Sequence, residues 1–106
     1  GAMKSLRPNK LKVFNLTYSI RFEDQTIQNG SESWGWCDHE TQTIVIMENQ
    51  KNEAMADTFK HELLHCLFTS IDSDDEEQIV SRLATGICTV WADNPKAFKW
   101  WADLIS

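Results

Sequence analysis

The hydrophobic pattern of this chain changes period near residue 52, and this change constrains the fold more than any other feature. From Phe14 to Phe22, apolar residues alternate strictly with polar ones, as they do in a strand with one buried face. From residue 53 onward, apolar residues recur every three or four positions, as they do in helices that pack on a core. Strands that come first and helices that follow predict an α+β domain.

Three strands are predicted in the first half of the chain. One covers residues 11–23, and two more, at 34–37 and 43–47, are close enough in sequence to form a β-hairpin. The polar stretch between the first strand and this hairpin contains the turn signal Asn29-Gly30. We therefore expect a small antiparallel sheet of about three strands.

Three helices are predicted in the second half, at residues 53–70, 75–92 and 95–104. The first is apolar nearly all round, which is typical of a helix buried at the centre of a domain, and Asn52 is its expected N-cap. Pro95 suits the first turn of the last helix. The expected fold is a small sheet packed on a helical hairpin, with a short C-terminal helix.

Length and composition indicate a single domain and limit the partners that this chain is expected to bind. A chain of 106 residues predicts one domain spanning 1–106, in which Gly1-Ala2 resembles the scar left when an expression tag is removed. No apolar run approaches the length of a membrane span, so no membrane partner is expected. Three widely spaced cysteines argue against a disulfide framework and favour the cytoplasm. A net charge of -6 argues against a nucleic-acid partner.

The first predicted helix carries His61-Glu62-Leu63-Leu64-His65, which has the pattern H-E-x-x-H. Histidines at i and i+4 lie one turn apart on the same face of a helix, so both imidazoles can reach one metal ion. The glutamate between them is the residue that activates water in zinc peptidases. A catalytic zinc site needs three protein ligands and one open position, so a third ligand must come from another segment.

Two glutamates just downstream are candidates for this third ligand. A short link between the first two helices predicts an antiparallel pair, in which Glu76 or Glu77 lies about as far after the turn as His65 lies before it. On a helical wheel, Glu76 is nearer the centre of the apolar stripe and Glu77 is at its edge. However, Ser73 to Glu76 has the pattern of a capping box, which would give Glu76 a structural role. The residues alone leave both glutamates open.

The helix pair resembles that of small prophage-encoded zinc metallopeptidases of the gluzincin type. The resemblance covers residues 33–95 and rests on H-E-L-L-H, a short link, Glu-Glu-x-Ile-Val-x-x-Leu-Ala-x-Gly and a closing Asp-Asn-Pro. In that family, the pattern Glu-x-x-Val-x-x-Leu-Ala holds the third ligand, and it falls here on Glu77. The resemblance thus favours Glu77, with Glu76 as the alternative.

The resemblance also implies an activity. It implies Zn²⁺ as the cofactor, His61 and His65 as metal ligands and Glu62 as the catalytic general base. It further implies that the strand at 43–47 is an edge strand, which pairs with an extended peptide or protein substrate. A phage-encoded protein of this kind would act in the cytoplasm of the host cell.

Two functions are therefore expected to compete. The first is a zinc-dependent metallopeptidase; the alternative is a phage-type regulatory or binding protein in which zinc is structural and no catalysis occurs. Glu62 distinguishes them, because hydrolysis needs this carboxylate and a structural zinc site does not. His39 either stabilises an oxyanion or is simply exposed in a loop, and Cys66 is expected to be a buried thiol rather than a ligand. The sequence predicts neither a particular substrate nor an oligomeric state.

Overall fold

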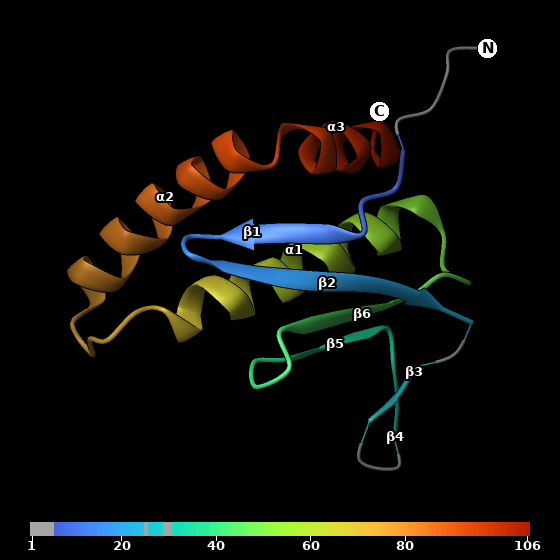
Figure 1. Cartoon of the computed structure of the whole chain (residues 1–106), viewed down its shortest axis with the longest axis horizontal. Helices are drawn as coiled ribbons and strands as arrows, with labels where there is room; N and C mark the ends of the chain where they lie inside the picture. Colours follow the sequence, from blue (N-terminus) through green and yellow to red (C-terminus); the bar gives the residue numbers. More distant parts are fainter. Residues whose placement is uncertain (1–5, 25, 29–30) are drawn as a thin grey trace.

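The computed structural model describes residues 6–24, 26–28 and 31–106, and it confirms the α+β fold (Figure 1). The main sheet has four strands in the order β1-β2-β6-β5, one strand more than predicted. β2 and β6 run parallel, whereas the two outer pairs are antiparallel, so the sheet is mixed. The strands are β1 (Lys10–Val13), β2 (Leu16–Glu23), β5 (Gly35–Asp38) and β6 (Thr43–Met47).

The extra strand arises because a turn at Phe14-Asn15 divides the predicted strand 11–23. Phe14 adopts a left-handed conformation with φ of 58°, which is unusual for a bulky residue and lets the chain reverse within two residues. Apolar residues fall on odd positions before the turn and on even positions after it. Both sets face the same core, because Leu11 lies opposite Tyr18 in the hairpin and both side chains are buried.

The predicted hairpin of β5 and β6 is confirmed, and the chain before it forms a further small sheet. This second sheet pairs β3 (Thr26–Gln28) with β4 (Ser31–Ser33) in an antiparallel arrangement. The turn predicted at Asn29-Gly30 lies between these two strands but outside the described residues.

β6 lies inside the main sheet, so the prediction that residues 43–47 form an edge strand is wrong. β2 lies parallel to β6 on one side and β5 lies antiparallel to it on the other. The parallel pairing with β2 joins segments that are distant in sequence. The continuous apolar run Ile44-Val45-Ile46 is typical of an internal strand, but it does not indicate which strand pairs with it. The end strands of the main sheet are β1 and β5, and of these β5 is the one next to the H-E-x-x-H helix.

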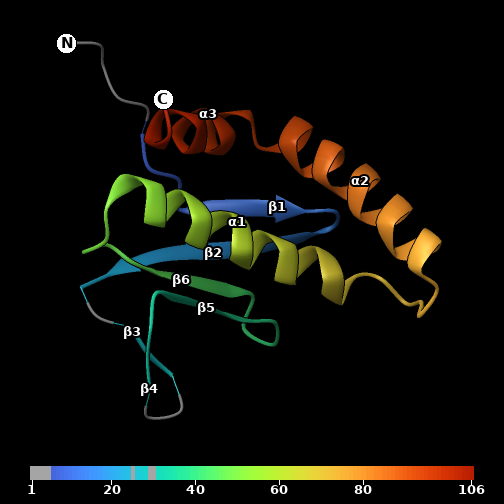
Figure 2. The ribbon, with the colours of Figure 1, turned by 180° about the vertical axis from the view of Figure 1, so that it is seen from behind.

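The three helices begin and end within one residue of their predicted bounds. They are α1 (Asn52–Thr69), α2 (Glu76–Asp93) and α3 (Pro95–Leu104). α1 crosses one face of the main sheet, while α2 and α3 lie on the β1 side (Figures 1 and 2). Lys51 is the N-cap of α1 and makes no side-chain capping bond, so the capping role predicted for Asn52 is wrong. In the described part of the chain, no helix has both the length and the apolar character needed to cross a membrane.

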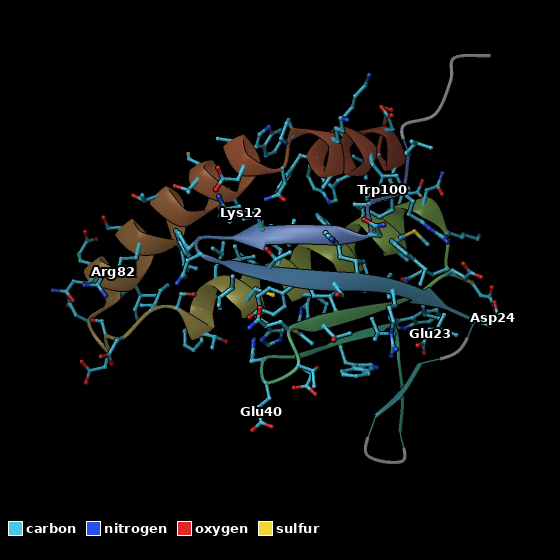
Figure 3. All side chains as sticks on the ribbon, viewed as in Figure 1. Lys12, Glu23, Asp24, Glu40, Arg82 and Trp100 are labelled. Carbon is cyan, nitrogen blue, oxygen red and sulfur yellow. The ribbon has the colours of Figure 1, made fainter. Side chains whose placement is uncertain are left out.

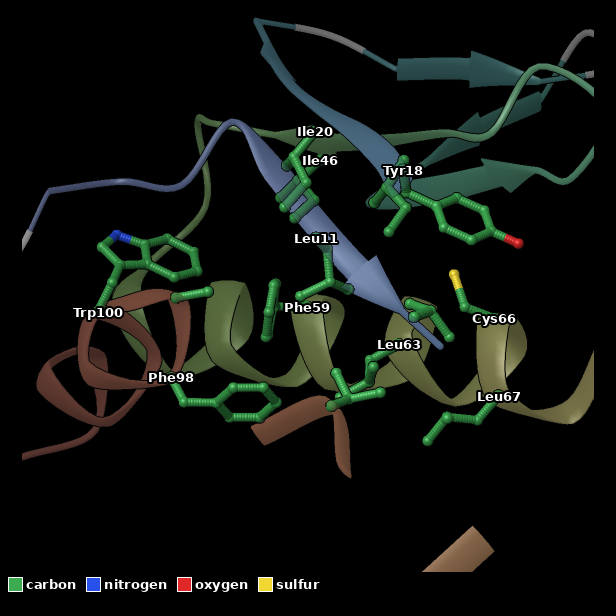
Figure 4. Packing of buried hydrophobic residues seen from close by; sticks show 14 of the residues in the cluster. Leu11, Tyr18, Ile20, Ile46, Phe59, Leu63, Cys66, Leu67, Phe98 and Trp100 are labelled. Atoms are coloured by element: carbon green, nitrogen blue, oxygen red, sulfur yellow. The ribbon is translucent and has the colours of Figure 1, made fainter. Parts of the chain in front are cut away.

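The core lies between α1 and the sheet, and α3 closes one end of it (Figure 4). Phe59 of α1 meets Trp100 of α3 edge to face, with ring centroids 5.5 Å apart. α1 is buried on one side only, because Leu64 and Phe68 remain exposed on the other. The prediction of a central helix that is buried all round is therefore wrong, and the histidine side of α1 faces outward.

α2 approaches the rest of the fold closely at Gly86. A Cβ atom at this position would lie 2.9 Å from Cδ2 of Leu67 and 3.3 Å from Cζ of Phe14, so the close contact depends on glycine. Elsewhere, α2 exposes three large apolar side chains: Val80, Ile87 and Trp91.

Candidate active site

The H-E-x-x-H motif occupies the middle of α1, and its two histidines meet on the exposed side of the helix. The Nε2 atoms of His61 and His65 are 3.1 Å apart, and the two rings lie edge to face. This convergence follows from the i, i+4 spacing, which places both side chains above the same turn. Two imidazole nitrogens therefore point to one common region of space, as a shared metal ion requires.

Glu62 lies between the histidines but points inward, toward the sheet. Its side chain is buried, with 5% of the residue exposed, and its carboxylate lies beside Gly35 of β5. Burial raises the pKa of Glu62 above its ordinary value, and the nearby charges of His61 and His65 partly oppose this shift. A carboxylate buried in this way costs stability when it is ionised.

A cavity of about 310 Å³ lies between the motif and the β5–β6 hairpin. Its volume is at the lower end of the range for small-molecule and cofactor sites. One wall comes from the motif and the other from the β5–β6 hairpin, and together the lining residues are Gly35, Trp36, Cys37, His39, His61, Glu62 and His65. The cavity thus brings together His39 and all three motif residues to which chemistry was assigned.

Gly35 allows β5 to approach α1 closely beside Glu62. A Cβ atom on Gly35 would lie 2.7 Å from Cγ2 of Thr58 and 3.4 Å from Oε2 of Glu62. Thr58 is itself held, because its hydroxyl donates a hydrogen bond of 2.9 Å to Gln50. No role was predicted for Gly35 from the sequence, although a glycine inside a strand is a recognised signal of close backbone approach.

We expect Gly35→Ala to lower the free energy of unfolding by about 1–3 kcal/mol, the usual cost of forcing an extra methyl group into a packed site. Chemical denaturation of the full chain measures this loss. Thr58→Ser removes the crowding methyl and keeps the hydroxyl that bonds Gln50, so adding it to Gly35→Ala should recover part of the stability. If the double variant is no more stable than Gly35→Ala alone, this contact is not the reason for the glycine.

His39 lies in the β5–β6 loop, and both of its ring nitrogens have partners in the protein. Nδ1 is 3.1 Å from the hydroxyl of Tyr18, and Nε2 is 2.9 Å from Oγ1 of Thr69. Thr69 donates its hydroxyl proton to the carbonyl oxygen of His65, so it accepts from Nε2–H of His39. His39 therefore fastens the loop to the end of α1, and an oxyanion role would require one of these bonds to open. Glu40, the next residue, projects into solvent (Figure 3).

Two thiols lie together at the cavity wall, one in its lining and one buried behind it. Sγ of Cys37 on β5 is 3.5 Å from Sγ of Cys66 on α1, and Cys66 is buried as predicted. The hydrogen bond between these thiols lowers the pKa of Cys37 and, together with burial, raises the pKa of Cys66. Burial also raises the pKa of Tyr18, whose ring lies beside Cys66 (Figure 4). Chemistry by phenolate or by Cys66 thiolate is therefore disfavoured at neutral pH.

Glu76 and Glu77 occupy the first turn of α2, and both are exposed. The N-cap of α2 is Asp75, whose carboxylate accepts a hydrogen bond from the backbone N–H of Gln78. The capping box predicted from Ser73 to Glu76 is therefore wrong, because the helix starts two residues later than that pattern requires. Glu76 is thus free of the structural role that had counted against it as a ligand.

A third ligand is not gathered at the histidine pair in this structure. Among the side chains of residues 6–24 and 34–106, no three of His, Cys, Asp or Glu form a group that could hold a metal ion. α2 nevertheless borders the histidine face, because Leu83 lines an apolar cavity of about 400 Å³ together with both histidines, Leu64 and Phe68. Glu77 lies on this same helix, six residues before Leu83.

Comparisons with known proteins identify no relative of this chain. No protein-family model, no curated protein and no solved structure matches the chain.

Proposed function

We propose that this protein is a zinc-dependent metallopeptidase in which Glu62 is the general base. The observation that carries the proposal is a buried carboxylate that lines a cavity beside two converging histidine nitrogens. A protein core gains nothing from such a carboxylate, whereas a catalytic site uses one. The resemblance of the helix pair to gluzincin-type metallopeptidases points to the same activity.

Zinc fits the donors that the chain presents. His61 and His65 offer two neutral imidazole nitrogens one helical turn apart, which is the usual half of a zinc site on a helix. When bound, zinc supplies Lewis acidity, which lowers the pKa of water and polarises a substrate carbonyl. The two histidines would hold the ion, while Glu62 points into the adjoining cavity and stays free for proton transfer.

Glu62 would act twice on the proton of the attacking water. It first accepts the proton as water adds to the scissile carbonyl, and it then delivers that proton to the leaving amine. The buried position of Glu62 suits this exchange, because its raised pKa brings the carboxylate closer to the range in which it both accepts and releases a proton near neutrality.

A peptide substrate would bind beside β5. This strand is the last in the sheet order, and residues 35–37 within it line the cavity that contains Glu62. An extended peptide added alongside β5 would therefore run past the carboxylate and the two histidines. The peptide would still bind by pairing with a strand of the sheet, as expected, but that strand would be β5 rather than residues 43–47.

The third ligand would come from the first turn of α2. α2 already borders the histidine face at Leu83, which favours a ligand from this helix. We assign it to Glu77, as the resemblance implies, with Glu76 as the alternative. Both glutamates are exposed, and the helix is capped by Asp75, so neither is committed to another contact that would hold it away from a metal.

We expect Glu77→Ala to weaken zinc binding by more than the roughly 10–100-fold that loss of an outer-shell group costs, because it would remove a ligand itself. Glu76→Ala is the matched control and should change the affinity little. Competition against a chromogenic chelator measures both constants. The opposite ranking would make Glu76 the ligand, and equal, negligible effects would mean that another group completes the site.

A second function, a binding protein with structural zinc, is favoured by the apolar surface beside the site. Leu64 and Phe68 of α1 and Val80 and Ile87 of α2 are exposed large apolar residues, which often mark a surface for a partner. Incubation of the zinc-loaded protein with an unbiased peptide library, read by mass spectrometry, separates the two functions. Cleavage at defined bonds supports the peptidase, whereas intact peptides throughout would favour the binding protein.

A further inference from the structure

The thiols of Cys37 and Cys66 differ in access although they are neighbours. Cys37 is half-buried and lines the cavity, so a small solute in the cavity can reach its sulfur. Cys66 is 1% exposed, and its sulfur points from α1 toward the strands (Figure 4). The two sulfur atoms are 3.5 Å apart, so they need to approach by only about 1.5 Å to reach the length of a disulfide bond.

We propose that Cys37 and Cys66 are an oxidation site, at which a peroxide converts the two thiols into a disulfide that joins β5 to α1. The inference does not depend on metal binding or on peptidase activity, since it rests on the position of the two sulfurs. It does bear on the site, because Cys37 belongs to the cavity wall that faces Glu62. The disulfide would fix the spacing of β5 and α1 at that wall.

The reaction balances with a peroxide as the two-electron oxidant. The Tyr18 hydroxyl first turns its proton away from Nδ1 of His39, which lies 3.8 Å from Sγ of Cys37. Nδ1 then accepts the thiol proton, and the thiolate attacks one peroxide oxygen. The O–O bond breaks, a sulfenic acid forms on Cys37, and the departing hydroxide takes the proton from His39 to give water. Sγ of Cys66 then attacks the sulfenic sulfur, and the released hydroxide takes the Cys66 proton as a second water.

Cys88 provides an internal control for this chemistry. It is exposed on α2, so simple accessibility would make it the first thiol to react. Proximity predicts the opposite outcome, because a disulfide between neighbouring sulfurs forms within one molecule, while Cys88 must find a second molecule. At micromolar protein, the intramolecular product should exceed all Cys88-containing disulfides by about tenfold or more.

Peptide mapping of the full-length chain tests the proposal, because trypsin places the three cysteines in separate peptides. After treatment with hydrogen peroxide and alkylation of the remaining thiols, digestion without reductant should link peptide 22–51 to peptide 61–82. The linked species should weigh about 2 Da less than the sum of the two reduced peptides, because two hydrogens leave. Peptide 83–96, which carries Cys88, should appear mainly alkylated.

Cys37→Ser, at a half-buried position that tolerates a smaller polar group, should abolish the linked species, and Cys88→Ser should leave its yield unchanged. Wild-type protein oxidised in guanidinium should lose the preference for this pair, because the preference depends on the fold. The proposal is overturned if folded protein yields mainly Cys88-containing disulfides, or if Cys37 and Cys66 stay reduced while Cys88 is oxidised.

Discussion

Replacing Glu62 by glutamine should abolish peptide hydrolysis while the fold and the zinc content stay intact. Glutamine keeps the size and the hydrogen-bonding oxygen of the side chain but cannot accept a proton from water. The loss of a general base typically costs about two to four orders of magnitude in rate. Cleavage of a peptide identified in the library screen, measured at saturating zinc, gives this ratio directly.

Glu40→Gln is the matched control, because Glu40 projects from the neighbouring loop into solvent (Figure 3) and is not among the residues that line the cavity. It makes the same change of charge and should leave hydrolysis unchanged. Cleavage that persists in Glu62→Gln would mean that another base, or a contaminating protease, does the chemistry. Zinc content that falls with Glu62→Gln would place this side chain among the ligands instead.

Glu62→Gln should abolish activity, yet it should stabilise the metal-free protein near neutral pH. Burial raises the folded-state pKa of Glu62 above its unfolded value, so the associated stability is present below the unfolded pKa and is lost as pH rises through the folded pKa. Glutamine does not ionise, so the Glu62→Gln variant does not lose stability in this way as pH rises. In metal-free protein, the variant should therefore become more stable than wild type as pH rises from acid toward neutrality, which a series of denaturation curves would show.

Local patterns were enough to predict the helices and the motif geometry. α3 begins at Pro95 and ends at Leu104 as predicted, because proline in the first turn and an apolar stripe are both properties of the local sequence. The convergence of His61 and His65 likewise needs only a helix with the right spacing. That Glu62 faces inward follows from the same helix once its apolar side is known.

Contacts between distant segments were not predictable in the same way. The central position of β6 depends on a parallel pairing with β2, and the sequence of neither strand names its partner. The continuous apolar run Ile44-Val45-Ile46, all of it buried, is nevertheless typical of an internal strand. The turn at Phe14 has no glycine or asparagine at its left-handed position, and only the shift from odd to even apolar positions indicates it. The partners of His39 and the approach of Gly35 to Thr58 likewise exist only once β5 lies against α1.

Removing either motif histidine should remove zinc binding and the stabilisation that comes with it. A ligand that binds only the folded state at about 100 times its dissociation constant adds about 2.7 kcal/mol to the free energy of unfolding. Each kilocalorie corresponds to roughly 4–8 °C in the melting temperature of a domain of about this size. We therefore expect zinc to raise the melting temperature of wild type by roughly 10 °C or more, and to leave that of His61→Ala or His65→Ala almost unchanged.

His39→Gln is a demanding control for this experiment, because it removes a histidine from the same cavity. His39 is held by Tyr18 and Thr69 and lies outside the converging pair, so the variant should still bind close to one equivalent of zinc, as measured by elemental analysis. Since it also loosens the loop, its metal-free melting temperature should fall, yet the increase on adding zinc should persist.

If His39→Gln loses zinc as fully as the motif variants do, the third donor is His39 rather than a glutamate of α2. If all three variants respond to zinc as wild type does, the histidine pair on α1 is not a metal site.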